Sequence, residues 1–65
     1  MYWIRLILFG VVVWERWLNS FNEAKEYCKG WEDFIVFQQD ADISQDIKDA
    51  IKIDEILETF LNTSH

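Results

Sequence analysis

The stretch Tyr2–Leu18, which reads YWIRLILFGVVVWERWL, decides how the rest of the chain must fold. It holds three of the four tryptophans, and its only charged residues are Arg5, Glu15 and Arg16. Its aromatic and β-branched side chains are the types that fill pleated, partly buried surfaces. Gly10 stands in the middle, where a two-residue turn needs a positive φ. We therefore predict a β-hairpin over residues 2–18, with its turn at residues 9–10 or 10–11.

Both faces of this hairpin are predicted to be apolar. Alternate residues of a strand point to opposite faces. One face of the first strand carries Tyr2, Ile4, Leu6 and Leu8, and the other carries Trp3, Ile7 and Phe9 together with Arg5. A sheet with two apolar faces needs something packed on each face, either a second helix of its own or another copy of the protein.

A membrane helix is the alternative structure for residues 1–18, and it would make the chain a single-pass membrane subunit. Such a helix needs about 20 mostly apolar residues. The uninterrupted apolar run extends only over residues 6–14, with Arg5 before it and Glu15 and Arg16 after it. The hairpin therefore fits the stretch better.

The best local signal in the chain is a capping box at Ser20-Phe21-Asn22-Glu23. In this motif the serine side chain caps a free backbone N–H, and the glutamate reaches back to the serine's own N–H. It predicts a helix over residues 21–29, ended by Gly30. One helix face would be apolar and the other would point toward water, with Phe21, Ala24 and Cys28 on the first and Lys25, Glu26 and Lys29 on the second.

A third strand is predicted over residues 33–38, which are rich in aromatic and β-branched types. If it lies beside the second strand, the two should be parallel and joined by a right-handed crossover. The short connection also allows the third strand to lie next to the first.

The longest helical pattern covers residues 43–61. Asp42 can cap this helix, with Gln45 in the capping-box position, and Ser44 is a second candidate cap. A break near Asp54 is an alternative, with Asp54 capping a second short helix. A broad apolar face is formed by Ile43, Ile47, Ala50, Ile53, Leu57, Phe60 and Leu61.

Taken together, these elements predict one α+β domain of order β-β-α-β-α over residues 1–65. A chain of 65 residues has room for one domain, and 51% hydrophobic with 17% aromatic residues is typical of a folded chain. Cys28 is the only cysteine and His65 the only histidine, so neither a disulfide framework nor a zinc set can form. A single cysteine without a disulfide partner fits a reducing cytoplasm.

The chain lacks a recognisable catalytic or cofactor motif. Cys28 has no histidine near it in the sequence, so we expect a small buried cysteine instead of a nucleophile. Paired acids such as Glu15, Glu23, Glu26, Glu32 and Asp33 fit a solvated surface. The acids Asp40, Asp42 and Asp46 lack the glycine and closing glutamate of a calcium loop, which favours capping. We predict no enzyme activity, no cofactor and no metal.

Function is therefore expected to depend on contact with a partner. The chain has six basic and twelve acidic residues, a net charge of −6, which disfavours direct nucleic-acid binding and favours a host protein with a basic surface. We expect an inhibitor of the type that phages and other mobile elements direct, in the host cytoplasm, at a nucleic-acid-binding or defence protein. Its carboxylates would stand where phosphates sit, and the predicted contact residues are Asp46, Asp49, Glu55 and Glu58.

The order of hairpin, helix and strand resembles several small phage inhibitors of a host polymerase in outline only, and no site residues are carried over from them. A second hypothesis is an oligomer, a homodimer or larger, that traps a small molecule or nucleotide. In that case tryptophan and tyrosine would stack on the ligand, and its charge would be held by Arg5, Arg16 or Lys25.

Overall fold

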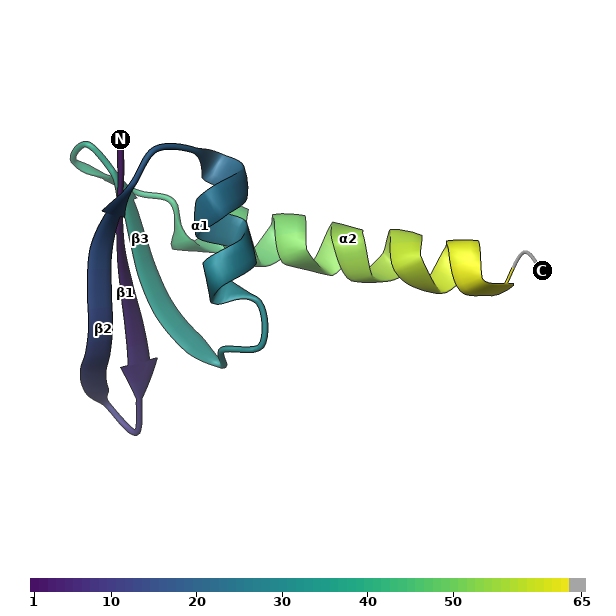
Figure 1. The fold of residues 1–65 in the computed structure, drawn as a ribbon, viewed down its shortest axis with the longest axis horizontal. Helices are drawn as coiled ribbons and strands as arrows, with labels where there is room; N and C mark the ends of the chain where they lie inside the picture. The colour runs from purple at the N-terminus through teal and green to yellow at the C-terminus, as the bar shows by residue number, and fades with distance from the viewer. Residues whose placement is uncertain (64–65) are drawn as a thin grey trace.

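The fold is α+β with the predicted element order, as the computed structural model shows for residues 1–63 (Figure 1). A two-residue strand, β4, was not predicted. The elements are β1 (Tyr2–Leu8), β2 (Val11–Leu18), α1 (Phe21–Cys28), β3 (Asp33–Gln38), β4 (Ala41–Asp42) and α2 (Ser44–Thr63).

The opening stretch forms the predicted hairpin, with its turn at the first of the two expected positions. Phe9 and Gly10 have φ angles of 51° and 77°, and two positive φ values in a two-residue loop are typical of a type I′ turn. The pairing shifts between Leu6 and Ile7, whose partners are Trp14 and Val12. The residue between those two partners, Val13, is therefore the extra residue of a β-bulge.

Residues 2–8 and 11–18 are thus extended strands joined by a turn, and the membrane helix proposed as an alternative for residues 1–18 is wrong. Across residues 1–63, no helix has the length and apolar character needed to span a membrane. The physical reason lies in the turn, because a chain that reverses at Phe9 and Gly10 pairs its backbone between two strands instead of along one helix.

The sheet order is β2-β1-β3-β4, and all neighbouring strands are antiparallel. β3 therefore lies next to β1, as one of the two predicted arrangements had it, and the parallel pairing of β2 with β3 does not occur. This order places the most apolar strand, β1, in the centre, where both of its edges find backbone partners. The chain crosses from β2 to β3 through α1, with β1 between the two strands (Figure 1).

Both helices pack on the same face of the sheet, so the arrangement with one helix of the chain on each face is wrong (Figure 1). Two hydrogen bonds to the backbone of Val36 tie the start of α2 to the edge of β3. Val36 N–H donates to Ser44 Oγ at 2.9 Å, and Ile43 N–H donates to Val36 O at 2.8 Å. The core on this face consists of Ile4, Leu6, Leu18, Ala24, Cys28, Phe34, Val36 and Ile47.

The start of α1 follows the predicted capping box with one difference. Glu23 N–H donates to Ser20 Oγ at 3.1 Å, as expected. The Glu23 carboxylate accepts from Asn19 N–H at 3.2 Å, instead of from the N–H of Ser20. The helix ends at Cys28, one residue earlier than predicted, and Gly30 follows with a φ of 85°.

The helix α2 is continuous from Ser44 to Thr63, so the predicted single helix forms, and the alternative with a break near Asp54 is wrong. Asp42 acts at its start, where its carboxylate accepts from Ser44 N–H at 2.9 Å and from Ser44 Oγ at 2.6 Å. Ile47 is fully buried, whereas from residue 53 onward the apolar side chains are mostly exposed. The second half of α2 projects away from the sheet, which makes the molecule elongated, 41 × 26 × 16 Å (Figure 1).

Candidate interaction surfaces

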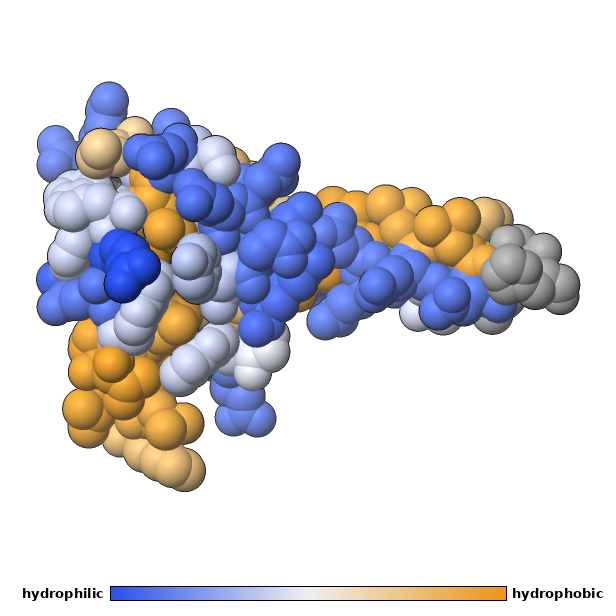
Figure 2. All heavy atoms as spheres, viewed as in Figure 1, coloured by the Kyte–Doolittle hydropathy of each residue, from blue (hydrophilic) through white to orange (hydrophobic). Residues whose placement is uncertain are grey.

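The projecting half of α2 carries a stripe of large apolar side chains, which we call the arm stripe. Its residues recur at the i, i+3, i+4, i+7, i+8 spacing that places side chains on one side of a helix. Between 54% and 69% of each side chain is exposed. Figure 2 shows hydrophobic residues along one side of α2 and hydrophilic residues along the other. The arm stripe consists of Ile53, Ile56, Leu57, Phe60 and Leu61.

The four predicted contact acids are all exposed on α2, but they do not share one side of it. Successive residues of a helix are rotated by about 100°, so positions nine residues apart point in about opposite directions. That separation divides Asp46 from Glu55, and Asp49 from Glu58. No flat surface can therefore meet all four at once. The sequence already contained this signal in the nine-residue spacing.

Asp46 and Asp49 lie on the same side as the arm stripe. Each precedes a stripe residue by seven positions, which is about two helical turns: Asp46 precedes Ile53, and Asp49 precedes Ile56. Asp49 also accepts a hydrogen bond from Gln45 Nε2 at 3.0 Å. The stripe therefore has two carboxylates at its N-terminal end.

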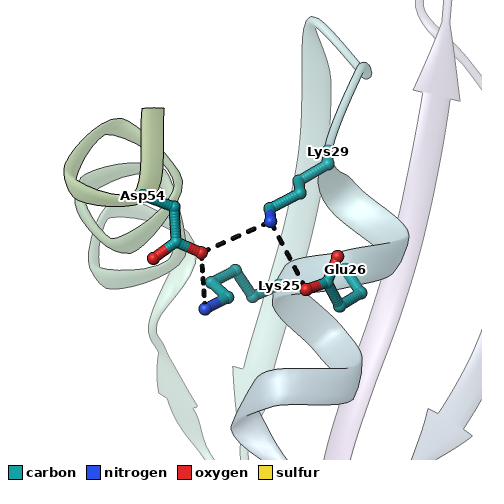
Figure 3. Close-up of polar contacts among 4 residues, drawn as sticks. All are labelled: Lys25, Glu26, Lys29 and Asp54. Carbon is teal, nitrogen blue, oxygen red and sulfur yellow. Dashed lines mark hydrogen bonds and ion pairs between the residues drawn. The ribbon is translucent and has the colours of Figure 1, made fainter. Parts of the chain in front are cut away.

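The base of the arm is held to α1 by an ion-pair cluster (Figure 3). Asp54 Oδ2 lies 2.7 Å from Lys25 Nζ and 3.3 Å from Lys29 Nζ, and Lys29 also pairs with Glu26 at 3.3 Å. Only 15% of the Lys25 side chain is exposed, so the expectation that Lys25 points toward water is wrong. The hydrogen bond from Lys25 is the largest of the causes that lower the pKa of Asp54. Asp54 therefore joins two helices instead of starting a third.

The sheet face opposite the helices, which we call the open face, is covered by no element among residues 1–63. The strand register arranges it as three rows across β2, β1 and β3. Trp3 and Trp17 contact at 4.8 Å between ring centroids, and Arg5 Nε pairs with Glu15 at 3.1 Å. The rows are Trp17-Trp3-Phe37, Glu15-Arg5-Ile35 and Val12-Ile7-Asp33.

The tip of the hairpin is a third exposed apolar feature. Leu8, Phe9 and Val11 are 48%, 97% and 61% exposed. A groove separates this tip from the loop between α1 and β3, and residues 7–10 and 30–33 line it. Figure 2 shows hydrophobic atoms gathered at this end of the molecule.

The groups considered for chemistry are occupied in structural roles. Cys28 is 1% exposed, and burial raises the pKa of its thiol to about 12, so at neutral pH the thiol stays protonated. No cluster of three or more metal-ligating side chains occurs in the part of the chain that the structure describes.

The cations of the ligand-trapping hypothesis are also engaged. Arg5 pairs with Glu15, and Lys25 pairs with Asp54. The Arg16 guanidinium lies 5.1 Å from the centroid of a Trp14 ring. A ligand would have to displace these contacts, so that hypothesis stays a prediction without a specific observation in its favour.

Comparison of the chain with protein-family models, with curated proteins and with solved structures gives no match. The surfaces are therefore interpreted from their physical chemistry alone.

Proposed function

We propose that this chain is a non-enzymatic binding protein whose α2 arm docks into an apolar groove on another protein. The observation that carries the proposal is the arm stripe, in which five large apolar side chains on a projecting helix are each more than half exposed. Amphipathic helices bind grooves through anchors at this spacing. The partner is expected to have Lys or Arg at one end of its groove, where Asp46 and Asp49 would meet them.

The magnitudes indicate why the acids matter. Covering the exposed part of one stripe residue is worth about 1–2 kcal/mol, so the five residues supply about 5–10 kcal/mol. Association costs about 4–15 kcal/mol in lost freedom of motion. The apolar gain alone is thus comparable to the cost, and charge pairs at the groove's end would add both affinity and a faster association rate.

A groove bordered by Lys and Arg is typical of proteins that bind nucleic acid. Occupation of such a groove would exclude the nucleic acid, which gives the chain the role of an inhibitor acting by contact. We extend the proposal to a host target of this type, encountered in the cytoplasm, where the buried free thiol of Cys28 would stay reduced.

The test compares two variants with matched charge. Asp46→Lys/Asp49→Lys and Glu55→Lys/Glu58→Lys each change the net charge from −6 to −2, and all four sites are exposed. Proteins that the wild type captures from a host lysate, and that the bare matrix does not capture, give the candidate partner, which Leu57→Asp is expected to lose. With that partner purified, the first double variant should associate at least about tenfold more slowly at low salt, and the second much less.

Three outcomes are informative. A loss confined to the Asp46 and Asp49 variant supports docking of the arm. Equal losses in both variants would instead favour carboxylates acting as phosphate mimics all around the helix. If Leu57→Asp and both double variants bind as the wild type does, the α2 arm is not the binding site.

A further inference from the structure

We propose that the open face is a dimer interface and that its occupant is a second copy of this chain. The proposal uses the sheet and is independent of the α2 arm. Trp3, Trp17 and Phe37 form one row of the face, and its middle row contains Arg5. Aromatic residues and arginine are the types enriched at the cores of protein interfaces, where other charged residues are depleted.

The distribution of charge identifies a second copy as the occupant. The chain has a net charge of −6, so two copies repel each other over most of their surface. Among residues 1–63 the middle row of the open face has one acid, Glu15, which is paired with Arg5. Asp33 and Asp42 lie at the rim, at the end of β3 and on β4. The centre of the open face is thus neutral, with two further acids at its rim, so two copies meet less repulsion there than over the rest of their surface.

The Arg5–Glu15 pair is also self-complementary. In this dimer the two open faces would stack on each other, with a two-fold axis between them that runs parallel to the strands and lies over the gap between β1 and β2. Arg5 of each copy would then lie opposite Glu15 of the other copy. The same rotation leaves each row at its level along the strands. Trp3 of each copy would therefore stack on Trp17 of the other copy. Each charge would then have two partners of opposite sign, which is the condition for burying an ion pair without leaving a charge uncompensated.

The size of the face fits a reversible dimer. The two strands that overlap in this arrangement, β1 and β2, give a footprint of about 20 Å along the strands and about 10 Å across them. With the exposed part of their large side chains, they offer roughly 400 Å² per copy, which is the size of a weak, transient interface. Dimerisation should therefore depend on protein concentration. The helices lie on the other side of the sheet, so the α2 arm stays accessible in the dimer (Figure 1).

The first test is sedimentation equilibrium of the wild type, Trp17→Ser and Leu57→Ser. Trp17 is 56% exposed in the single copy, so its replacement leaves the core intact. We expect a monomer–dimer equilibrium for the wild type, a dissociation constant raised at least about tenfold by Trp17→Ser, and no change with Leu57→Ser. Leu57→Ser is the control that separates this interface from the α2 arm.

The second test uses charge exchange and does not depend on a large side chain. Glu15→Arg gives a face with two cations, and Arg5→Glu gives a face with two anions. Each variant alone should be monomeric, because like charges of its two copies would face each other. An equimolar mixture of the two variants should form a heterodimer, because opposite charges would then face each other. Circular dichroism of each variant checks that the sheet is intact.

The proposal would be overturned by a wild type that stays monomeric up to about 1 mM, the concentration beyond which association is very weak. It would also be overturned by a dimer that Leu57→Ser abolishes and Trp17→Ser leaves unchanged. Neither result bears on whether the arm binds a partner groove, which is measured with the separate variants described above.

Discussion

Truncation of two isoleucines on the same helix tests whether α2 is held at one end only. Ile47 is 0% exposed and Ile53 is 56% exposed, and Ile→Ala removes the same three carbons at each site. At Ile47 the lost burial is worth about 0.8 kcal/mol per carbon, and the cavity left behind adds to this, for about 3 kcal/mol in total. A chain of 65 residues has a free energy of unfolding of about 3–10 kcal/mol, so this loss is a large share.

Ile53→Ala should change the free energy of unfolding by no more than about 0.5 kcal/mol, because the side chain is mostly in water and alanine favours the helix. Urea denaturation followed by circular dichroism measures both variants. With a slope of about 1 kcal/mol/M, the Ile47→Ala midpoint should fall by about 2–3 M and the Ile53→Ala midpoint by less than about 0.5 M. Equal losses at the two sites would refute the picture of an anchored base and a projecting arm.

Four further predictions concern local contacts. Ser20→Ala should lower the free energy of unfolding, measured by urea denaturation, by about 1 kcal/mol, because it removes the cap of α1. Gly30→Ala should cost about 1 kcal/mol although the added Cβ meets nothing within 4 Å, because φ is 85° there, and Gly30→Asn should cost less. Burial raises the pKa of Cys28 from 9.0 to about 12, so the folded state keeps a proton that the unfolded state releases in that interval. Stability should fall from pH 9 to 12, with a smaller fall in Cys28→Ala. The pKa of Asp54 is lowered, chiefly by the hydrogen bond from Lys25, so its contribution is present above about pH 4 and is lost as the pH falls below that value. The thermal unfolding midpoint of Asp54→Asn should therefore fall less than that of the wild type as the pH is lowered below about 4.

The sequence predicted well the features that depend on neighbouring residues. The capping residue Ser20 lies eight positions before the end of its helix, and the glycines at positions 10 and 30 mark the turns where φ is positive. Such signals involve residues that are close together in the sequence, so they can be recognised without knowledge of the fold. The β-bulge at Val13 and the shift of the Glu23 contact to Asn19 are small adjustments of the same local patterns.

The sequence by itself determined which residues are apolar, which cap a helix and where the chain turns. Only the tertiary structure decided which apolar residues are covered. Ile47 and Ile53 look alike in the helical pattern, yet Ile47 is buried and Ile53 is exposed. The two faces of β1 look alike in the strand pattern, yet Ile4 and Leu6 on one face are buried while the other face is half-buried. The physical reason is that burial depends on partners distant in the chain. Both helices packed on the face that holds Ile4, Leu6 and Val36, and this packing left the open face and the second half of α2 uncovered among residues 1–63.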